Sequence, residues 1–183
     1  KVILVNEGNL LIFMDGVFEI KRMIRKIQGM PLARHFEVFP LFGEMSLEDQ
    51  DRAIEFAGRR KIIVSTNIAE TSLTVDGVSL IIDTGMAKKA SFDPTRGINV
   101  LLSQPICKSS ADQRAGRAGR TSDGYCLRLW TSAEHQRKEE FEPPEVSRLD
   151  LAELYLNMLS IDERPDSLVW FDELPESSLE RAS

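Results

Sequence analysis

Short apolar runs alternate with amphipathic stretches along the first 130 residues. Residues 10–13 are apolar throughout, as in a buried strand, and residues 17–27 place apolar side chains every three or four positions among Lys and Arg, which predicts a helix. A second strand is predicted over 37–42, followed by a helix capped by Ser46. This alternation predicts an α/β fold with a parallel sheet covered by helices.

Further elements follow the same rhythm. Residues 61–65 and 79–83 are apolar enough for central strands, so the sheet should have at least four strands. A helix is expected from Ser110 into an arginine-rich run. A strand over 125–129 and a helix over 132–140 would complete the domain.

Two segments depart from this pattern. Residues 88–105 contain two alternating stretches on either side of Asp93-Pro94-Thr95-Arg96-Gly97, which predicts a protruding β-hairpin. Pro143-Pro144 indicates a boundary between a domain over 1–142 and the truncated start of a second domain over 143–183. The second would begin with a strongly apolar helix over 149–159.

Composition narrows the class. The chain has 183 residues, 42% hydrophobic and 28% charged, as in a globular protein, and its first residue, Lys1, leads us to expect a longer natural protein. No apolar run approaches the roughly 20 residues that span a bilayer. Cys107 and Cys126 lack metal-ligand or disulfide spacing, which favours free thiols in a reducing cytoplasm, and His35 and His135 lack a nucleophile pattern.

Charge is segregated along the chain. The formal net charge is −6, which argues against a nucleic-acid partner. Residues 88–120, however, carry seven Lys or Arg against two Asp, whereas residues 121–183 carry six against fifteen acidic residues. The acidic total therefore hides a basic stretch.

The basic stretch ends in the most informative segment, Gln113-Arg114-Ala115-Gly116-Arg117-Ala118-Gly119-Arg120. On a helix, arginines three apart would share a face and could point toward one polyphosphate. A merely solvated basic helix is the alternative, but it would rarely contain two interior glycines, each of which costs about 1 kcal/mol.

The run 113–120 resembles motif VI of the DEAH-box group of superfamily 2 helicases, and Ser65-Thr66-Asn67-Ile68-Ala69-Glu70-Thr71-Ser72-Leu73-Thr74-Val75-Asp76-Gly77-Val78 resembles their motif V. Residues 10–16 resemble motif IV, and residues 40–46 with Gln50 resemble the segment that follows it. The resemblance covers roughly residues 8–160. Residues 92–94 with Gly97, and 144–146, are most similar to bacterial HrpB-type helicases.

The resemblance implies the second RecA-like motor domain of an ATP-dependent RNA helicase. It assigns Gln113 to the attacking water or the γ-phosphate, and Arg117 and Arg120 to the phosphate as arginine fingers. Arg114 is expected to be structural. The hairpin occupies the place of one thought to help separate strands, and the helix over 149–159 resembles the start of a winged-helix domain.

The resemblance also implies two binding sets. Gly43, Thr66 and Asn67 would contact RNA phosphates, which positions a strand without reading its sequence. The expected ATP contacts are Ser72, Thr74 and Asp76. For Ser72 and Thr74, local capping of the backbone is an open alternative.

One position departs from the family. Where many eukaryotic members place an aromatic residue on the adenine, this chain has Ile54, with Phe56 two residues on. An aliphatic side chain covers a purine without reading it, so we expect weak discrimination among nucleoside triphosphates.

The sequence contains no Gly-x-x-x-x-Gly-Lys-Ser/Thr loop and no Asp-Glu-Ala-His segment. A first RecA-like domain, upstream in the same chain, is therefore expected to hold ATP and Mg²⁺, and this chain alone should be inactive and should hold no metal. Its partner would be single-stranded or partly duplex RNA, with no membrane, and the protein would be a monomer.

Two other classes of function stay open. One is a RecA-like module that has lost its motor role and binds RNA or a protein. The other is a metabolic α/β enzyme with a phosphate-binding loop, although dinucleotide fingerprints are absent. A Lys-bearing phosphate loop in the parent protein would favour the motor.

Overall fold

The computed structural model describes residues 7–55, 58–120, 123–164, 167–172, 174–176 and 178–179. They fall into two compact units, one formed by residues 1–87 and 103–142 and the other by residues 88–102 and 143–183. The elements are, in chain order, β1 (Asn9–Phe13), α2 (Val17–Gln28), η1 (Pro31–His35), β2 (Glu37–Leu41), α3 (Leu47–Ile54), β3 (Lys61–Ser65), α4 (Ile68–Thr71), β4 (Val78–Asp83), β5 (Met86–Asp93), β6 (Ile98–Pro105), α5 (Lys108–Ala115), β7 (Tyr125–Arg128), α6 (Ser132–Gln136), η2 (Glu145–Ser147) and α7 (Ala152–Ser160).

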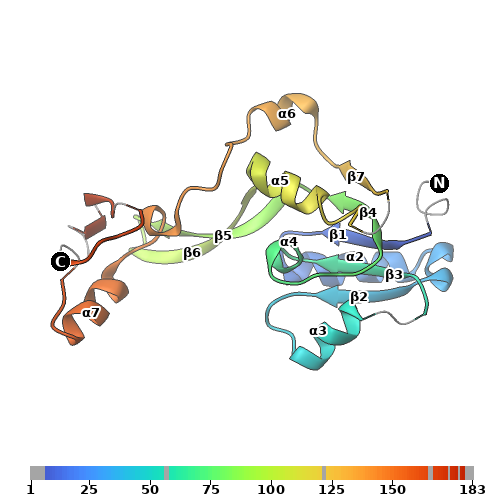
Figure 1. Cartoon of the computed structure of the whole chain (residues 1–183), viewed down its shortest axis with the longest axis horizontal. Helices are drawn as coiled ribbons and strands as arrows, with labels where there is room; N and C mark the ends of the chain where they lie inside the picture. Colours follow the sequence, from blue (N-terminus) through green and yellow to red (C-terminus); the bar gives the residue numbers. More distant parts are fainter. Residues whose placement is uncertain are drawn as a thin grey trace. The chain divides into compact units, whose positions relative to one another are not determined.

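The first unit is built on a five-stranded sheet in the order β2-β3-β1-β4-β7 (Figure 1). Every neighbouring pair is parallel. The α/β fold with a parallel sheet is therefore confirmed. Because parallel strands share one direction, the loops that follow β1, β2, β3 and β4 all leave from the same edge of the sheet.

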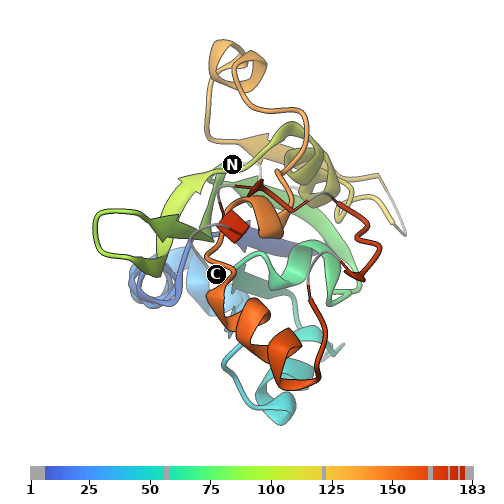
Figure 2. The same cartoon turned by 90° about the vertical axis from the view of Figure 1, so that its left-hand side faces the viewer.

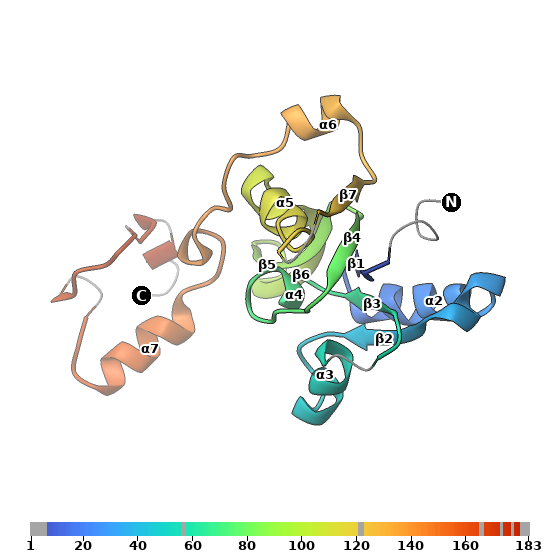
Figure 3. The ribbon, with the colours of Figure 1, turned by 45° about the vertical axis from the view of Figure 1, so that its right-hand side comes forward.

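Helices cover both faces of this sheet, as Figure 3 shows for α2 on one side and α3 on the other. One core layer joins Leu10, Ile12, Ile62, Val64 and Leu80 to residues of α2. The opposite layer joins alternate residues of the same strands to α3 and α4. The central strands are buried on both faces, which explains why their sequences are apolar runs without alternation.

Local sequence signals explain the helix boundaries. The hydroxyl of Ser46 accepts a hydrogen bond from the backbone N–H of Asp49 at 3.2 Å and so caps α3, as predicted. At the N-terminus of α6, Thr131 and Glu134 form a complete capping box.

In the second unit, the predicted hairpin is present: β5 and β6 pair as a two-stranded sheet whose turn contains Gly97 at φ +66°. The chain beyond residue 143 is tied to it. The N–H of Phe92 donates to the carbonyl of Arg148 at 2.7 Å, and Arg148 Nη1 donates to the carbonyl of Ala90 at 2.8 Å. The hairpin strands thus share a compact unit with the segment that contains α7, the orange helix in Figure 2.

Three helices differ from the sequence expectation. Helix α5 begins at Lys108 and ends at Ala115, short of the last two arginines of the run, because Gly116 ends it. Helix α6 stops at Gln136, and α7 starts only at Ala152. Phe56 and Ala57 lie outside the described residues. Across the described ranges, no helix combines the length and apolar character of a membrane span.

Candidate functional site

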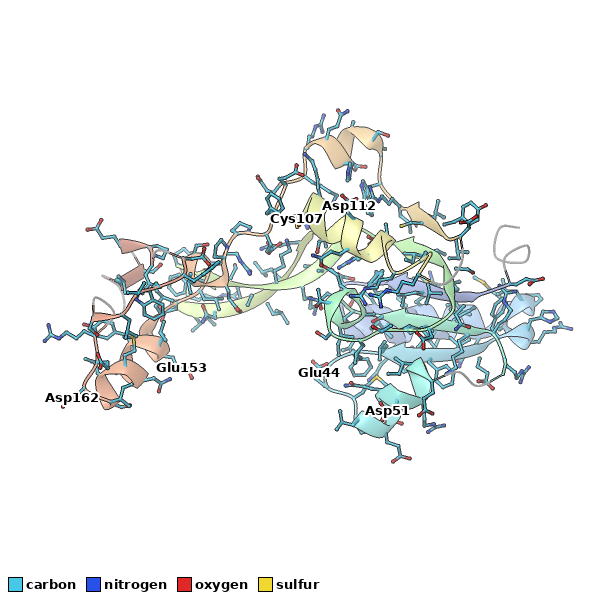
Figure 4. All side chains as sticks on the ribbon, viewed as in Figure 1. Glu44, Asp51, Cys107, Asp112, Glu153 and Asp162 are labelled. Carbon is cyan, nitrogen blue, oxygen red and sulfur yellow. The ribbon has the colours of Figure 1, made fainter. Side chains whose placement is uncertain are left out.

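The three residues expected to contact RNA lie at the carboxyl edge of the sheet. Thr66 and Asn67 follow β3 directly, and Gly43 lies two residues beyond β2, the adjacent parallel strand. The N–H of Thr66 donates to the carbonyl of Leu41 at 3.1 Å, which ties the two loops together. Glu44, next to Gly43 in this exposed loop, is labelled in Figure 4.

The buried side-chain amide of Gln50 holds the loop after β2 in place. Gln50, on α3, donates through Nε2 to the carbonyl of Met45 at 3.2 Å and to that of Gly43 at 3.4 Å. Gly43 has no atom within 4 Å of the place where a Cβ would stand. Space for a ligand therefore exists beside the backbone at Gly43, while the side chain of Gln50 fixes the loop from the protein side.

Helix α4 connects the expected RNA set to the expected ATP set. It is a single turn, with Asn67 as its N-cap and Ser72 as its C-cap. The side chain of Asn67 makes no capping hydrogen bond and is exposed, so its amide is available to a ligand. Between the two caps lies Glu70, whose side chain points into the protein.

Glu70 and Arg114 form the centre of a buried ionic network. Arg114 is completely buried, and its Nε donates to Glu70 Oε2 and its Nη1 to Asp83 Oδ1, both at 2.9 Å. Its guanidinium also lies over the ring of Phe13, 4.7 Å from the centroid. The hydroxyl of Ser110 donates to the second carboxylate oxygen of Glu70. Arg114 is therefore structural, as expected, and joins α5 to α4, β4 and β1.

The three arginines of the run do not share a helical face. After α5 ends at Ala115, Gly116 adopts the C-cap position and Gly119 takes a φ of +86°, a conformation that favours glycine. The geometric expectation of one arginine stripe is therefore wrong. The two glycines turn the backbone so that Arg117 and Arg120 lie beyond the helix.

Arg117 and Arg120 both rest on the segment that follows α4. Arg117 donates to the carbonyls of Glu70 and Leu73, the latter at 3.2 Å, and so caps the C-terminal end of α4. Burial lowers the pKa of the Arg117 guanidinium, the charge of Arg120 lowers it further, and Glu70 opposes both. Arg120 is more exposed and donates from Nη1 to the hydroxyl of Thr74 at 3.0 Å.

The remaining expected site residues lie in different parts of the first unit. Gln113 lies on α5 next to Asp112, labelled in Figure 4, and its side chain is exposed. Ser72 has no side-chain hydrogen bond among the described residues, and Thr74 is bound to Arg120 rather than to local backbone. Asp76 is exposed near the amino edge of the sheet, where its carbonyl accepts from Asn9 Nδ2 at 2.9 Å.

Thus Thr74 and Arg120 are brought together, and so are Gly43, Thr66 and Asn67, whereas Asp76 lies toward the opposite sheet edge from the second group. Ile54, considered for the adenine, packs partly against the core. Within the described part of the chain, no group of three or more His, Cys, Asp or Glu side chains is placed to hold a metal ion.

Sequence reasoning missed Glu70, Asp83 and Ser110 as functional positions. A signal for Asp83 was present, because a carboxylate that ends a largely apolar strand is expected to need a cationic partner. Glu70 gave no such signal, since its neighbours on a one-turn helix do not show which side is buried.

Comparison with known proteins gives a consistent result. The model of the helicase conserved C-terminal domain matches residues 2–122. The ATP-dependent RNA helicase HrpA of Borreliella burgdorferi is 42% identical over 159 residues, which are 86% of this chain and 19% of that protein. The ATP-dependent RNA helicase HrpB of Escherichia coli is 37% identical, over 94% of this chain and 22% of that protein.

A solved structure agrees with these sequences. The crystal structure of the E. coli DExH-box NTPase HrpB matches with a TM-score of 0.84 at 36% identity, covering 99% of this chain and 23% of that one. The RecA-like fold is thereby confirmed. The chain spans about a fifth of the length of the relatives to which it is compared.

Proposed function

Because this chain belongs to the helicase conserved C-terminal domain family and is similar to DEAH-type ATP-dependent RNA helicases, we propose that it is the second motor domain of such an enzyme. In this role the domain closes on ATP held by a first RecA-like domain of the same protein and carries half of the track for single-stranded RNA. The bound ATP supplies the phosphoryl group that is transferred to water.

The proposal rests on how the arginine run of residues 113–120 is held in place by its neighbours. Arg114 is locked by two carboxylates, which fixes the end of α5, and the next two arginines lie on the segment after α4. Arg120 keeps an exposed guanidinium whose position is defined by Thr74. A positioned but accessible guanidinium fits an arginine finger, because the cation is in place before charge develops on the phosphate.

Gln113, Arg117 and Arg120 serve in this proposal as the groups that meet the γ-phosphate and the attacking water. Arg117 would exchange its two carbonyl partners for phosphate oxygens, a stronger charge-assisted contact. Ser72 and Thr74 would contact the nucleotide beside these groups, and Asp76, nearer the amino edge of the sheet, would complete the set. Mg²⁺ would be bound by the first domain, since this sequence contains no Gly-x-x-x-x-Gly-Lys-Ser/Thr loop and no Asp-Glu-Ala-His segment.

Gly43, Thr66 and Asn67 form the proposed RNA contact. They share the carboxyl edge of β2 and β3, where an exposed backbone, a hydroxyl and an amide lie on neighbouring loops. Such groups bind phosphate or ribose rather than bases, in keeping with a motor that moves along any sequence. α4 joins this set to the nucleotide side within one helical turn.

The division into a motor domain over 1–142 and the start of a winged-helix domain over 143–183 is also proposed, with the hairpin acting at the strand-separation point. The parent enzyme would work as a cytoplasmic monomer. With Ile54 at the adenine position, it would accept several nucleoside triphosphates.

The decisive experiment measures RNA-stimulated ATP hydrolysis by the parent protein, comparing wild type with Arg117→Ala and Arg120→Ala, with this chain alone as a control. Loss of one finger is expected to reduce kcat by about 10³-fold or more. The chain alone should show no turnover.

The alternative is a RecA-like module that binds RNA or protein without a motor role. Intact Gln113, Arg117 and Arg120 favour the motor. Absence of ATP hydrolysis in the parent, or undiminished turnover in both variants, would reject the motor and leave the binding module.

A further inference from the structure

Helix α2 presents a basic face that none of the functions above uses. Lys21, Arg22, Arg25 and Lys26 lie on one side of the helix and are all exposed. η1 follows at the end of this helix and carries a further exposed cation, Arg34. A sixth cation, Arg59, donates from Nη2 to the carbonyl of Arg34 at 3.3 Å. We call these six residues the α2 basic face.

None of the six has a carboxylate partner in the part of the chain that the structure describes. The contrast with other cations is clear, since ion pairs with Asp or Glu are formed by Arg52, Arg96, Lys108, Arg114 and Arg128 within the described residues. These pairs are Arg52–Asp49, Arg96–Asp93, Lys108–Glu140, Arg114 with Glu70 and Asp83, and Arg128–Asp112. The α2 basic face is therefore an unmatched positive region on a chain whose net charge is −6.

Helix stability accounts for only part of this arrangement. Arg25 and Lys26 lie in the last turn of α2, where positive charge interacts favourably with the helix dipole. Lys21 and Arg22 lie in the middle of the helix and gain nothing from the dipole. Each instead stands four residues before another cation, at Arg25 and Lys26, and like charges at this spacing repel. Repulsion between these cations opposes folding. The cations therefore indicate a role outside the folded chain, which is to bind an external anion.

The α2 basic face is separate from the proposed RNA track. α2 begins after the carboxyl end of β1 and returns toward the amino edge of the sheet, where β2 starts. Arg34 and Arg59 precede β2 and β3 and so lie at this amino edge. Gly43, Thr66 and Asn67 lie at the carboxyl edge, across the length of the strands.

We propose that the α2 basic face binds the phosphate backbone of RNA outside the single-strand track, as a second anchoring surface; this rests on the proposed helicase function. Clustered Lys and Arg attract a polyanion without reading its bases. A protein partner would need an apolar centre among the charges. The exposed large apolar side chains of this segment, Phe18 and Met30, lie instead at the two ends of α2.

The test neutralises the middle of this face in the parent helicase with Lys21→Gln, Arg22→Gln, Arg25→Gln and Lys26→Gln combined, because glutamine preserves helix propensity. Binding of a long oligouridine is measured against salt concentration, beside a short oligouridine that fills only the track. For the long RNA, the slope of log K against log salt should fall by up to about 3, since each phosphate contact to a single strand contributes roughly 0.7.

At low salt this corresponds to long-RNA affinity that is weaker by at least an order of magnitude, while binding of the short RNA and kcat at saturating RNA stay unchanged. The matched control removes four cations elsewhere, with Arg52→Gln, Lys108→Gln, Arg137→Gln and Arg164→Gln combined. It lowers the net charge by the same amount. The slope of log K against log salt should differ from that of the wild type by no more than the contribution of one phosphate contact. Thermal melting checks that both variants are folded.

Equal losses of long-RNA affinity in both variants would mean that the effect comes from net charge alone, and they would overturn the proposal. Unchanged long-RNA binding would also overturn it, and loss of an acidic protein partner in that case would assign the face to protein. These failures leave RNA-stimulated ATP hydrolysis intact. Its absence from the wild-type enzyme would instead reject the proposed helicase function, so the two failures are distinguishable.

Discussion

The arginines at the end of α5 and the cations of the α2 basic face carry the same kind of charge in opposite surroundings. Arg114 is completely buried, with two carboxylates at 2.9 Å. Lys21 and Arg22 are exposed, and no carboxylate of the described residues pairs with them. The first region holds its charge through a network shared by four elements, whereas the second holds its charge on one helix face.

The difference separates two uses of positive charge. A buried, matched cation fixes backbone and contributes to function by positioning its neighbours Arg117 and Arg120. An exposed cation without a carboxylate partner fixes no backbone, and its main contribution is to the binding of an anion from solution. Removal of a matched cation should therefore change stability, and removal of unmatched cations should change binding.

The largest expected effect breaks the buried network. Arg114→Met removes the cation that pairs with both Glu70 and Asp83 and leaves two buried carboxylates, which should destabilise the protein by about 3–5 kcal/mol. Urea-induced unfolding gives this value. Arg22→Met on the α2 basic face is the matched control and should change the free energy of unfolding by less than about 0.5 kcal/mol. Similar losses in the two variants would remove the distinction between the regions.

A smaller effect is expected from the other side of the same ion pair. Glu70→Gln keeps an acceptor for Ser110 but leaves Arg114 with one carboxylate, and should cost about 1–3 kcal/mol. Asp112→Asn, which removes an exposed ion pair from the same helix α5, should cost at most about 1 kcal/mol. If the exposed pair proved as costly as the buried one, burial would not be the cause.

Much of this fold follows from apolar periodicity. The central strands and α2 were predicted within one or two residues, because long apolar runs and a clear 3.6-residue period leave few alternatives. The end of α5 was misjudged, because arginine and alanine favour helix while Gly116 and Gly119 give a weaker signal whose effect depends on tertiary contacts.

The candidate site was only partly accessible from sequence. Gly43, Thr66 and Asn67 were expected from the family resemblance, and the parallel topology explains why their loops adjoin at one edge of the sheet. The docking of Arg120 on Thr74, and of Arg117 on the end of α4, joins residues more than forty positions apart and cannot be read from spacing. The α2 basic face was missed because the pattern of residues 17–27 shows an amphipathic helix but not which of its charges find partners.

An effect of opposite sign should appear on the α2 basic face. Lys21→Gln with Arg22→Gln removes both like-charge pairs at four-residue spacing and keeps the two cations near the helix end. The free energy of unfolding should therefore rise by about 0.4–1 kcal/mol at low salt. The gain should shrink as salt is added, because exposed charges are screened. A loss of stability would show that these cations have partners within the protein.

The smallest effect on stability is expected at a charge that is exposed but has a partner within the protein. Glu134 is fully exposed, but its carboxylate accepts hydrogen bonds from the N–H and the hydroxyl of Thr131, and these contacts lower its pKa below the ordinary value of 4.5. A depressed carboxylate pKa contributes stability that is present above pH 4.5 and is lost as pH falls through the folded-state pKa. Glu134→Gln keeps a neutral acceptor for the capping box, so the variant should be less stable than wild type near neutral pH, and the difference should shrink toward acid. Chemical unfolding of both proteins across this range measures it. A difference that did not change with pH would mean that the negative charge of Glu134 adds nothing to the capping contact. Exposure, rather than the presence of a partner, would then decide what a surface charge contributes to stability.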